Sequence, residues 1–373
     1  MLIGINALAC EPGSSTGDAT YVRELVAHLS GCDPSVRYAL FAAHWQAKLF
    51  RPAPNLRIVP CGVPRGSRVL RAIWEQVALP AQAARVGVDL FHAPVNVAPL
   101  GVRGPLVLTL LEAEPFLPGA QLPAWLTLYW RALRGASARR AQRVLAISDS
   151  AAREIITSMA LPPECVTTIP LGVDLQRFQA HGLSREPGGY LLWIGQAYPR
   201  KNLELLIQAY ALLRRAGDNP PPLHLLGPSA FRHARARALV SALGLGDWVR
   251  FEGWIPDANL AAWYRGAALL VLPSGHEAFG LPLLEALACG TAVLASDLPA
   301  LREVGGDAAA FVRPVSAEAL ATVIQSLLDD PGRRGDLAAA GPLRAAAFSW
   351  EGTARGTLAA YRSVLGSPDR PML

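Results

Sequence analysis

Residues 268–295 read ALLVLPSGHEAFGLPLLEALACGTAVLA, and this stretch shows how the chain is built. Short apolar runs at 268–272 and 292–295 have the length and composition of buried strands. Between them, residues 281–288 form a predicted helix, and Pro282 suits its first turn. A strand, a helix and a second strand in this order form a βαβ unit, which implies a parallel sheet.

The same alternation of short apolar runs and longer helical segments continues along the whole chain. Further predicted strands are 2–7, 38–42, 56–59, 90–92, 106–110, 144–147, 190–194, 223–226 and 249–252. Further predicted helices are 20–29, 124–140, 203–215, 259–267, 317–328 and 349–364. Residues 168–187 mix turn residues without a sustained period, so we interpret them as a linker between domains.

These patterns predict an α/β protein with two Rossmann-like, doubly wound parallel-sheet domains. The expected first domain is 1–170 and the second is 171–350, with 351–373 as a helix and tail that cross back to the first. Parallel sheets bind ligands beyond the carboxyl ends of their strands. Two such domains that face a central cleft would therefore carry their chemistry in the loops that follow strands.

Composition narrows the class of protein. Of the 373 residues 51% are hydrophobic and 17% charged, which excludes wholesale disorder. The longest uncharged stretch, 115–130, contains three prolines and is shorter than the roughly 20 residues that a bilayer span needs. Five scattered cysteines and a start without a basic leader favour reduced thiols and a cytoplasmic location. The net charge of +6 permits attraction to phosphates or anionic lipid.

The loop after the predicted strand 190–194 reads GQAYPRKN and places two cations side by side, Arg200 and Lys201. A guanidinium and an ammonium together suit a diphosphate, because one grips oxygens in a fork and the other acts as a compact charge. The alternative is a solvated helix start. Cations at a helix N-terminus interact unfavourably with the helix dipole, which counts against this alternative.

The loop after the predicted strand 268–272 carries two acids eight residues apart, Glu277 and Glu285. Gly280 and Leu281 lie between them at the predicted helix start, where exposed N–H groups form an anion site. Carboxylates beside a phosphate site can accept hydrogen bonds from the paired hydroxyls of a ribose or a hexose. The alternatives are a surface loop acid for Glu277 and a favourable N-terminal helix charge for Glu285.

These motifs resemble a known family. The stretches 195–202, 249–267 and 272–309 resemble the donor-binding half of the retaining GT-B glycosyltransferases called family 4, and the likeness extends over 190–328 and to the tail 348–365. The resemblance implies that Arg200, Lys201, Gly280 and Leu281 bind the donor diphosphate. It implies that Glu285 holds the ribose, that Ile255 contacts the base, and that Glu277, the catalytic candidate, addresses the sugar with the Phe279 backbone.

In the first domain the likeness is weaker. Gly17 lies in the loop that, by the resemblance, approaches the donor phosphates from the acceptor side; the alternative is a plain helix N-cap. Leu111 and Glu112 stand where many relatives have His-Asp, so a histidine near the transferred sugar is missing. Glu112 is a candidate to face the acceptor. His92, at an earlier strand end, is the nearest other polar candidate, and a buried structural histidine is the alternative.

Residues 125–143 hold Trp125, Tyr129 and Trp130 followed by five arginines. Such a helix can rest on anionic lipid, which would make the protein peripheral at the inner face of a membrane. The alternative is that the aromatic side chains are core and the arginines are merely solvated.

The resemblance implies a retaining, metal-independent enzyme without a cofactor that moves a hexose from a nucleotide-diphospho-sugar to a glycan or glycolipid acceptor. GDP-mannose is the first expectation for the donor, and bacterial cell-surface polysaccharide synthesis for the pathway. A catalytically silent nucleotide-sugar-binding paralogue is the alternative, favoured by Leu111. A pyridoxal-phosphate phosphorylase lacks a suitable lysine, and no nucleic-acid-binding motif accompanies the basic charge.

Overall fold

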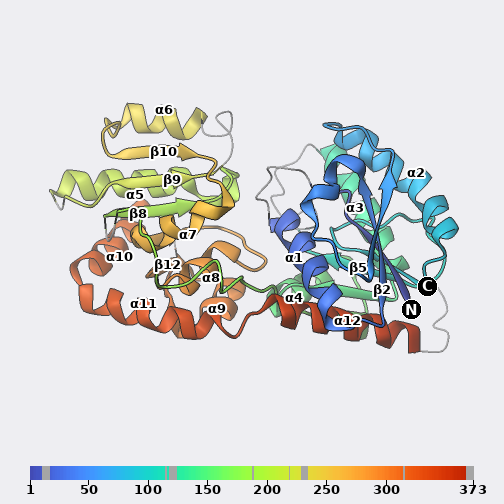
Figure 1. Ribbon diagram of the computed structural model, residues 1–373. Helices are drawn as coiled ribbons and strands as arrows, with labels where there is room; N and C mark the ends of the chain where they lie inside the picture. Colours follow the sequence, from blue (N-terminus) through green and yellow to red (C-terminus); the bar gives the residue numbers. More distant parts are fainter. Residues whose placement is uncertain are drawn as a thin grey trace. The chain divides into compact units, whose positions relative to one another are not determined.

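The computed structural model describes residues 1–10, 17–113, 116, 124–186, 189–217, 219–227, 234–313 and 316–366. The chain divides into two compact units (Figure 1). The first unit comprises Met1–Gly172 and Trp350–Leu373, and the second comprises Val173–Ser349. The boundaries expected from the sequence, after residues 170 and 350, lie two residues and one residue from these.

A seven-stranded sheet runs through the described part of the first unit in the order β3-β2-β1-β4-β5-β6-β7. Every neighbouring pair is parallel. The strands are β1 (Leu2–Asn6), β2 (Arg37–Ala43), β3 (Leu56–Cys61), β4 (Leu90–Ala93), β5 (Leu106–Leu110), β6 (Arg143–Ala146) and β7 (Val166–Thr168). The order reverses direction after β3, as in a doubly wound sheet.

Helices cover both faces of this sheet. They are α1 (Gly17–Cys32), α2 (Arg68–Val86), α3 (Ala124–Arg140), α4 (Asp149–Met159) and α12 (Trp350–Gly366), with short 3₁₀ turns at His44–Leu49 and Pro163–Cys165. Parallel crossovers are right-handed, so α2, α3 and α4, which lead towards β7, share one face, and α1 lies on the other. The last helix, α12, packs beside α1 (Figure 1).

The second unit has a six-stranded parallel sheet within its described residues, in the order β10-β9-β8-β11-β12-β13. Its strands are β8 (Tyr190–Ile194), β9 (Leu223–Leu226), β10 (Val249–Gly253), β11 (Ala267–Leu272), β12 (Val293–Ser296) and β13 (Ala310–Val312). Its helices are α5 (Leu203–Ala216), α6 (Ala234–Ala242), α7 (Asp257–Gly266), α8 (Leu281–Ala288), α9 (Pro299–Gly305), α10 (Ala317–Asp329) and α11 (Pro331–Ala345), with 3₁₀ turns at Pro199–Lys201 and Gly306–Ala308.

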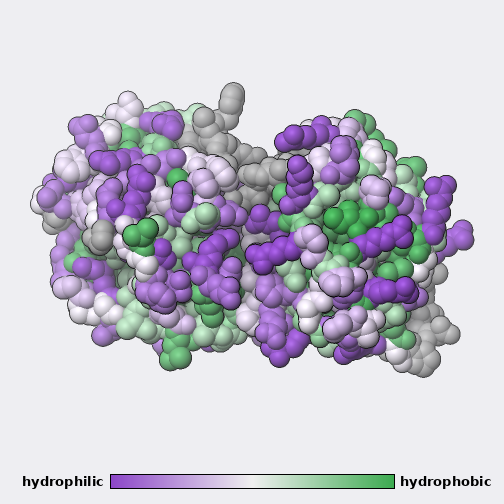
Figure 2. All heavy atoms as spheres, viewed as in Figure 1, coloured by the Kyte–Doolittle hydropathy of each residue, from purple (hydrophilic) through white to green (hydrophobic). Residues whose placement is uncertain are grey.

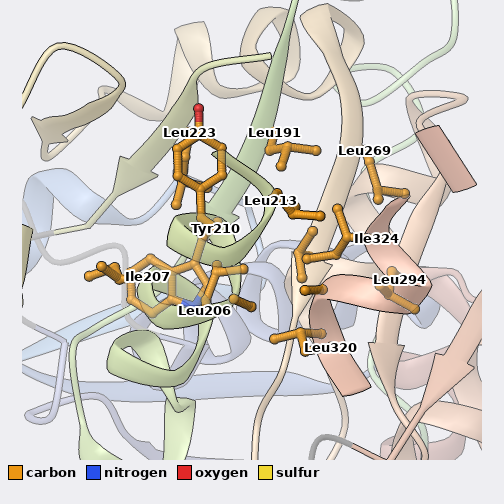
Figure 3. Packing of buried hydrophobic residues seen from close by; sticks show 14 of the residues in the cluster. Leu191, Leu206, Ile207, Tyr210, Leu213, Leu223, Leu269, Leu294, Leu320 and Ile324 are labelled. Atoms are coloured by element: carbon orange, nitrogen blue, oxygen red, sulfur yellow. The ribbon is translucent and has the colours of Figure 1, made fainter. Parts of the chain in front are cut away.

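Helices α5 and α10 pack side by side on one face of this second sheet and form an apolar core (Figure 3). Its residues are almost entirely hydrophobic, as expected for strands buried on both faces. The labelled members are Leu191, Leu206, Ile207, Tyr210, Leu213, Leu223, Leu269, Leu294, Leu320 and Ile324. This core fixes the strand ends on which the candidate site is built.

The segment 168–187, predicted as the linker between domains, contains the boundary between the two units at Gly172 and Val173, but most of it is packed rather than extended between them. Phe178 is buried and packs edge-on against Tyr264, with 6.0 Å between ring centroids. The guanidinium of Arg265 donates hydrogen bonds to the carbonyl oxygens of Gln179 (3.1 Å) and Leu183 (2.8 Å). Residues 173–186 are therefore packed onto the second unit, although they form no helix or strand, whereas 168–172 belong to the first unit.

Two expectations from composition can be compared with the described residues. None of their helices combines the length and the apolar character needed to cross a membrane. All five cysteine thiols are free, and burial raises the pKa of Cys10, Cys61 and Cys289 to about 12.

Candidate functional site

The two loops singled out by the sequence are joined at one edge of the second sheet. They follow β8 and β11, which are neighbouring strands. The Gly275 N–H donates to the carbonyl oxygen of Arg200 (2.7 Å), and the Asn202 side-chain amide donates to the carbonyl oxygen of Pro273 (2.9 Å). Both bonds join the loop after β8 to the loop after β11, so they fix the position of one loop relative to the other.

Three charged side chains meet where these loops join. The ammonium of Lys201 is hydrogen-bonded to Glu277 Oε1, and Arg200 Nη1 lies 3.9 Å from Glu277 Oε2. Ser274 Oγ also donates to Glu277 Oε1 (2.7 Å). The side chains of Lys201 and Glu277 are only 13% and 10% exposed, so their attraction is screened less than that of a surface pair. The sequence prediction that these residues converge is consistent with this geometry.

The charge state of Glu277 follows from its neighbours. Burial by itself raises the pKa of this carboxyl, but the Lys201 ammonium, the Arg200 guanidinium and two hydrogen bonds more than offset burial and leave the pKa below its ordinary value. Glu277 is therefore ionised at neutral pH. The cluster holds two cations and one anion, with one positive charge in excess.

The second acid, Glu285, has a different environment. It projects from α8, and Tyr264 OH donates a hydrogen bond to its Oε2 (2.8 Å). Burial raises the pKa of Glu285 to about 7, against the smaller opposing effects of the Tyr264 hydrogen bond and the Arg177 charge. Two carboxyl groups on one loop and helix thus differ in protonation near neutrality, which makes each suited to a different task.

The start of α8 requires glycine. Gly280 has φ of 106°, which L side chains rarely adopt, and a Cβ there would lie 2.6 Å from Leu301 Cδ2. Leu281 follows as the first residue of α8 and is half-buried. The ring of Phe279 is buried against Phe348 (5.9 Å between centroids), so only the Phe279 backbone is available to a ligand. The half-buried Ile255 lies between β10 and α7.

A feature that the sequence reasoning missed is a row of glycines at three neighbouring strand ends. Gly195, Gly227 and Gly253 terminate β8, β9 and β10, and they are linked by hydrogen bonds from Gly195 N–H to the Leu226 oxygen (3.0 Å) and from Gly227 N–H to the Gly253 oxygen (2.9 Å). A Cβ on Gly227 would lie 1.8 Å from the Gly195 carbonyl oxygen. The signal in the sequence was a glycine after each of the three predicted strands.

Replacing Gly227 with alanine is expected to destabilise the protein by about 2–4 kcal/mol, because the new methyl group collides with backbone that cannot move without breaking the strand end. Gly246→Ala is the matched control, since its Cβ would meet no atom within 4 Å. Urea unfolding of both variants is the measurement. Equal unfolding free energies for the two variants would contradict this account of the strand end.

Two candidates in the first unit remain predictions. Gly17 is the first residue of α1, but residues 11–16, which complete its loop, lie outside the described residues, so neither the phosphate contact nor the N-cap alternative is decided. Glu112 is half-buried, and its carbonyl oxygen accepts from Arg134 (3.2 Å). Leu111 beside it is buried, and its N–H donates to Asn96 Oδ1 (2.8 Å).

His92 is the structural histidine of the two alternatives, so the candidate acceptor role is corrected. It has no exposed surface, Nε2 is hydrogen-bonded to Thr109 Oγ1 (2.9 Å), and Nδ1 is hydrogen-bonded to Tyr361 OH (2.7 Å). Burial lowers its pKa to about 3, so the ring is neutral. Both nitrogens are occupied within the core, and none is left for a substrate.

Two protein-family models match this chain, one over each of its two units. Residues 176–344 match the family model described as glycosyl transferases group 1, and residues 16–177 match the model described as glycosyltransferase family 4. Together the two models account for most of both units.

Among curated relatives, O-antigen chain mannosyltransferase B of Escherichia coli is 35% identical over 60% of this chain and 61% of its own length. D-inositol 3-phosphate glycosyltransferase of Frankia alni is 36% identical over 60% of this chain and 59% of its own length. The match thus spans about three fifths of the length of these relatives.

Two solved structures share the fold over nearly the whole chain. Sucrose-phosphate synthase from Thermosynechococcus elongatus has a TM-score of 0.81 at 24% identity, covering 98% of this chain and all of that chain. HepE of Anabaena in complex with UDP and glucose has a TM-score of 0.75 at 19% identity, covering 97% of this chain and all of that chain. With both family models matched and two parallel-sheet units present, the chain belongs to the family 4-like glycosyltransferases of the GT-B fold.

Proposed function

We propose that this protein binds a nucleotide-diphospho-sugar on its second unit and transfers the sugar to a hydroxyl group of a glycan or glycolipid. The observation that carries the proposal is the cluster of Arg200, Lys201 and Glu277, which the ends of two neighbouring strands bring together. Its excess positive charge lies beside the glycine-started helix α8. Cations and free N–H groups in one place are the groups that bind a diphosphate.

The donor diphosphate would share the two cations with Glu277. As the bond between the sugar and the diphosphate breaks, negative charge grows on the departing oxygen, and fixed cations stabilise that charge more than the ground state. Glu277, which is ionised, is then the group placed to accept hydrogen bonds from sugar hydroxyls. Glu285 in its ionised form would accept from the paired hydroxyls of the ribose.

Retention of configuration requires no strong protein base in this scheme. The acceptor oxygen approaches the anomeric carbon from the face that the diphosphate leaves, and the acceptor proton passes to an oxygen of the departing phosphate. One carbon–oxygen bond breaks and another forms, with no metal ion and no cofactor in the scheme. The buried Leu111 at the position of the family histidine is compatible with this route, because no step uses that side chain.

Mannose is the proposed hexose, with GDP-mannose as donor, because an O-antigen mannosyltransferase is among the relatives. A ligand that binds only the folded protein raises its melting temperature. In a panel of GDP-, UDP- and ADP-sugars we therefore expect GDP-mannose to give the largest rise. Glu285→Ala should remove that rise, and an absence of any rise across the panel would contradict donor binding.

A donor-binding but catalytically silent protein is the second candidate, and the observation that favours it is Leu111, which is 6% exposed and offers no polar side chain. Release of nucleoside diphosphate from a labelled donor, measured with an acceptor extract, separates the two functions. Binding without release would support the silent protein, and acceptor-dependent release would support the transferase.

A further inference from the structure

The Glu285 carboxyl depends on one tyrosine for its hydrogen bond. Tyr264 lies in α7, which packs against α8, and it has no exposed surface. Its OH donates to Glu285 Oε2 (2.8 Å), and in the described part of the chain this is the one hydrogen bond that the carboxyl accepts. A buried phenol needs an acceptor, and here the acceptor is a residue of the candidate site.

The other oxygen of this carboxyl remains available. Charged residues usually lie at the surface, and Figure 2 shows hydrophilic residues over much of the visible face of the second unit. Glu285 is instead half-buried on α8. Its Oε1 accepts no hydrogen bond from the described residues, yet it remains accessible. One oxygen is thus fixed, and the other can accept from a hydroxyl group outside the chain.

Tyr264 is held at both its side chain and its main chain. The Phe178 ring packs edge-on against its ring (6.0 Å between centroids), and Thr291 Oγ1 donates to its carbonyl oxygen (2.7 Å). Thr291 follows α8 closely and is tied to that helix, because its N–H donates to the Ala286 oxygen (3.0 Å). The phenol therefore cannot turn away from Glu285 without disturbing this packing.

The phenol is always the donor in this pair. Burial, and next the negative charge of Glu285, raise the pKa of Tyr264 well above its ordinary value. A hydrogen bond to the ionised carboxylate favours that form, so it lowers the pKa of Glu285 against the larger effect of burial. The Arg177 charge acts in the same direction, and the Asp257 charge acts against both. The nearby Cys289 thiol, with a pKa of about 12, is neutral.

The other elements that pack on α8 meet it through residues without titratable groups. Helix α9 contacts it through Leu301, and α11 contacts it through Gly341, beside Leu287. Leu287 lies two residues after Glu285 and therefore on the opposite side of the helix. Strands β11 and β12 contain no titratable residue. The protonation of Glu285 is therefore controlled from α7 and by Arg177.

We propose that Tyr264 is a positioning residue of the donor site: its hydroxyl fixes Glu285 Oε2 and so leaves Oε1 for the hydroxyl groups of the bound ligand. The inference rests on the proposed function, in which Glu285 holds the ribose. Tyr264 acts through Glu285 and transfers no proton. Without the Tyr264 hydroxyl, the carboxyl loses the bond that favours its ionised form, and it more often carries a proton on an oxygen that the ligand needs.

Replacing Tyr264 with phenylalanine tests this role, because the ring stays in the core and only the donor is lost. Calorimetry of the full chain with GDP-mannose, or with the panel donor that binds more tightly, is carried out between pH 6 and pH 9. We expect about fivefold weaker binding than wild type at pH 7, since losing one hydrogen bond to a carboxylate raises its pKa by about one unit. The difference should shrink towards pH 9, where the carboxyl is ionised in both proteins.

Tyr190→Phe is the matched control. Tyr190 also has no exposed surface, and its OH donates to the carbonyl oxygen of Trp263 (2.7 Å), the residue before Tyr264 in α7. This variant removes a buried hydrogen bond to the same helix without touching Glu285, so its affinity profile should follow that of wild type. In a Glu285→Gln background, Tyr264→Phe should add no pH dependence, because the titrating carboxyl is absent.

A loss of affinity in Tyr264→Phe that is equal at every pH would reduce Tyr264 to a packing role and overturn the inference. An unchanged profile, or the same shift in Tyr190→Phe, would also overturn it. If wild type bound no nucleotide-sugar, the proposed function would fail together with this inference. If wild type bound the donor and the variant showed no shift, only the inference would fail.

Urea unfolding of the free protein is the second measurement, and it needs no ligand. The folded pKa of Glu285 lies above its ordinary value, so stability falls as the pH rises to about 7 in wild type. In Tyr264→Phe the stability should continue to fall to about pH 8, because the carboxyl stays protonated over a wider range. The same end point in both proteins would contradict the effect of the Tyr264 hydroxyl on Glu285.

Discussion

A protein with Glu277 replaced by glutamine is expected to lose at least about a hundredfold in sugar transfer while it still binds nucleoside diphosphate at least as tightly as the wild type. The two effects have one cause. In the free protein Glu277 occupies Lys201 and Arg200, so its carboxylate competes with a diphosphate for these cations. Glutamine keeps the shape and removes the competing charge, but it cannot serve as the anionic acceptor for the sugar.

Transfer is measured with the donor and acceptor found by the panel described above, and diphosphate affinity by calorimetry. Lys201→Met is the companion variant, and it should weaken diphosphate binding because it removes a cation. If Glu277→Gln lost diphosphate affinity in parallel with transfer, Glu277 would have only the structural role of holding the two loops together. The assignment to the sugar would then be wrong.

Donor affinity is expected to depend on pH through Glu285. A ribose diol donates two hydrogen bonds, so the carboxyl must be ionised to accept both. Since the pKa of Glu285 in the free protein is about 7, donor affinity should increase about tenfold per unit as the pH is raised towards 7. Above pH 7 the affinity should become constant. Glu285→Gln should bind the donor weakly with no such pH dependence. Calorimetric titrations between pH 5 and 8 in wild type and variant make the comparison.

The raised pKa of Glu285 also predicts that the stability of the fold decreases as the pH rises, whereas donor affinity increases. The folded pKa of Glu285 lies above its ordinary value of 4.5, so the unfolded chain releases this proton first as the pH rises. Stability is therefore lost between pH 4.5 and about 7, by about 3 kcal/mol in total. Glu285→Gln avoids this cost, so it should be more stable than wild type at pH 8 and equal to it near pH 4.5. Urea unfolding at both pH values measures the difference, and a constant difference would contradict the shifted pKa.

The strands of both sheets could be predicted closely, because parallel strands buried on both faces are continuous apolar runs. Each of the eleven predicted strands lies within two residues of a strand in the structure. The short strands β7 and β13, of three residues each, were missed, since so short a run has no period. Helix α11 was missed because its sequence PGRRGDLAAAGPLRA contains two prolines and three glycines.

Only those features of the site that follow from the sheet topology could be predicted from the sequence. The rule that strand ends share an edge brings Arg200 and Lys201 to Glu277, but Ser274 as a partner of Glu277 depends on side-chain geometry. The different protonation of Glu285 also depends on burial, which spacing does not reveal. His92 could not be assigned from the sequence, because its partner Tyr361 is 269 residues away.

That hydrogen bond bears on the order in which the protein forms during synthesis. Helix α12 contributes Tyr361 to His92 and Thr353 Oγ1 to the Pro170 oxygen (2.7 Å), so the first unit is completed by residues that emerge from the ribosome after the whole of the second. Until residues 350–366 have left the exit tunnel, His92 Nδ1 lacks its hydrogen bond to Tyr361, and the face of α1 that packs against α12 is exposed to solvent. The first unit can therefore complete its fold only after the second unit has been synthesised, and until then part of its apolar interior is exposed.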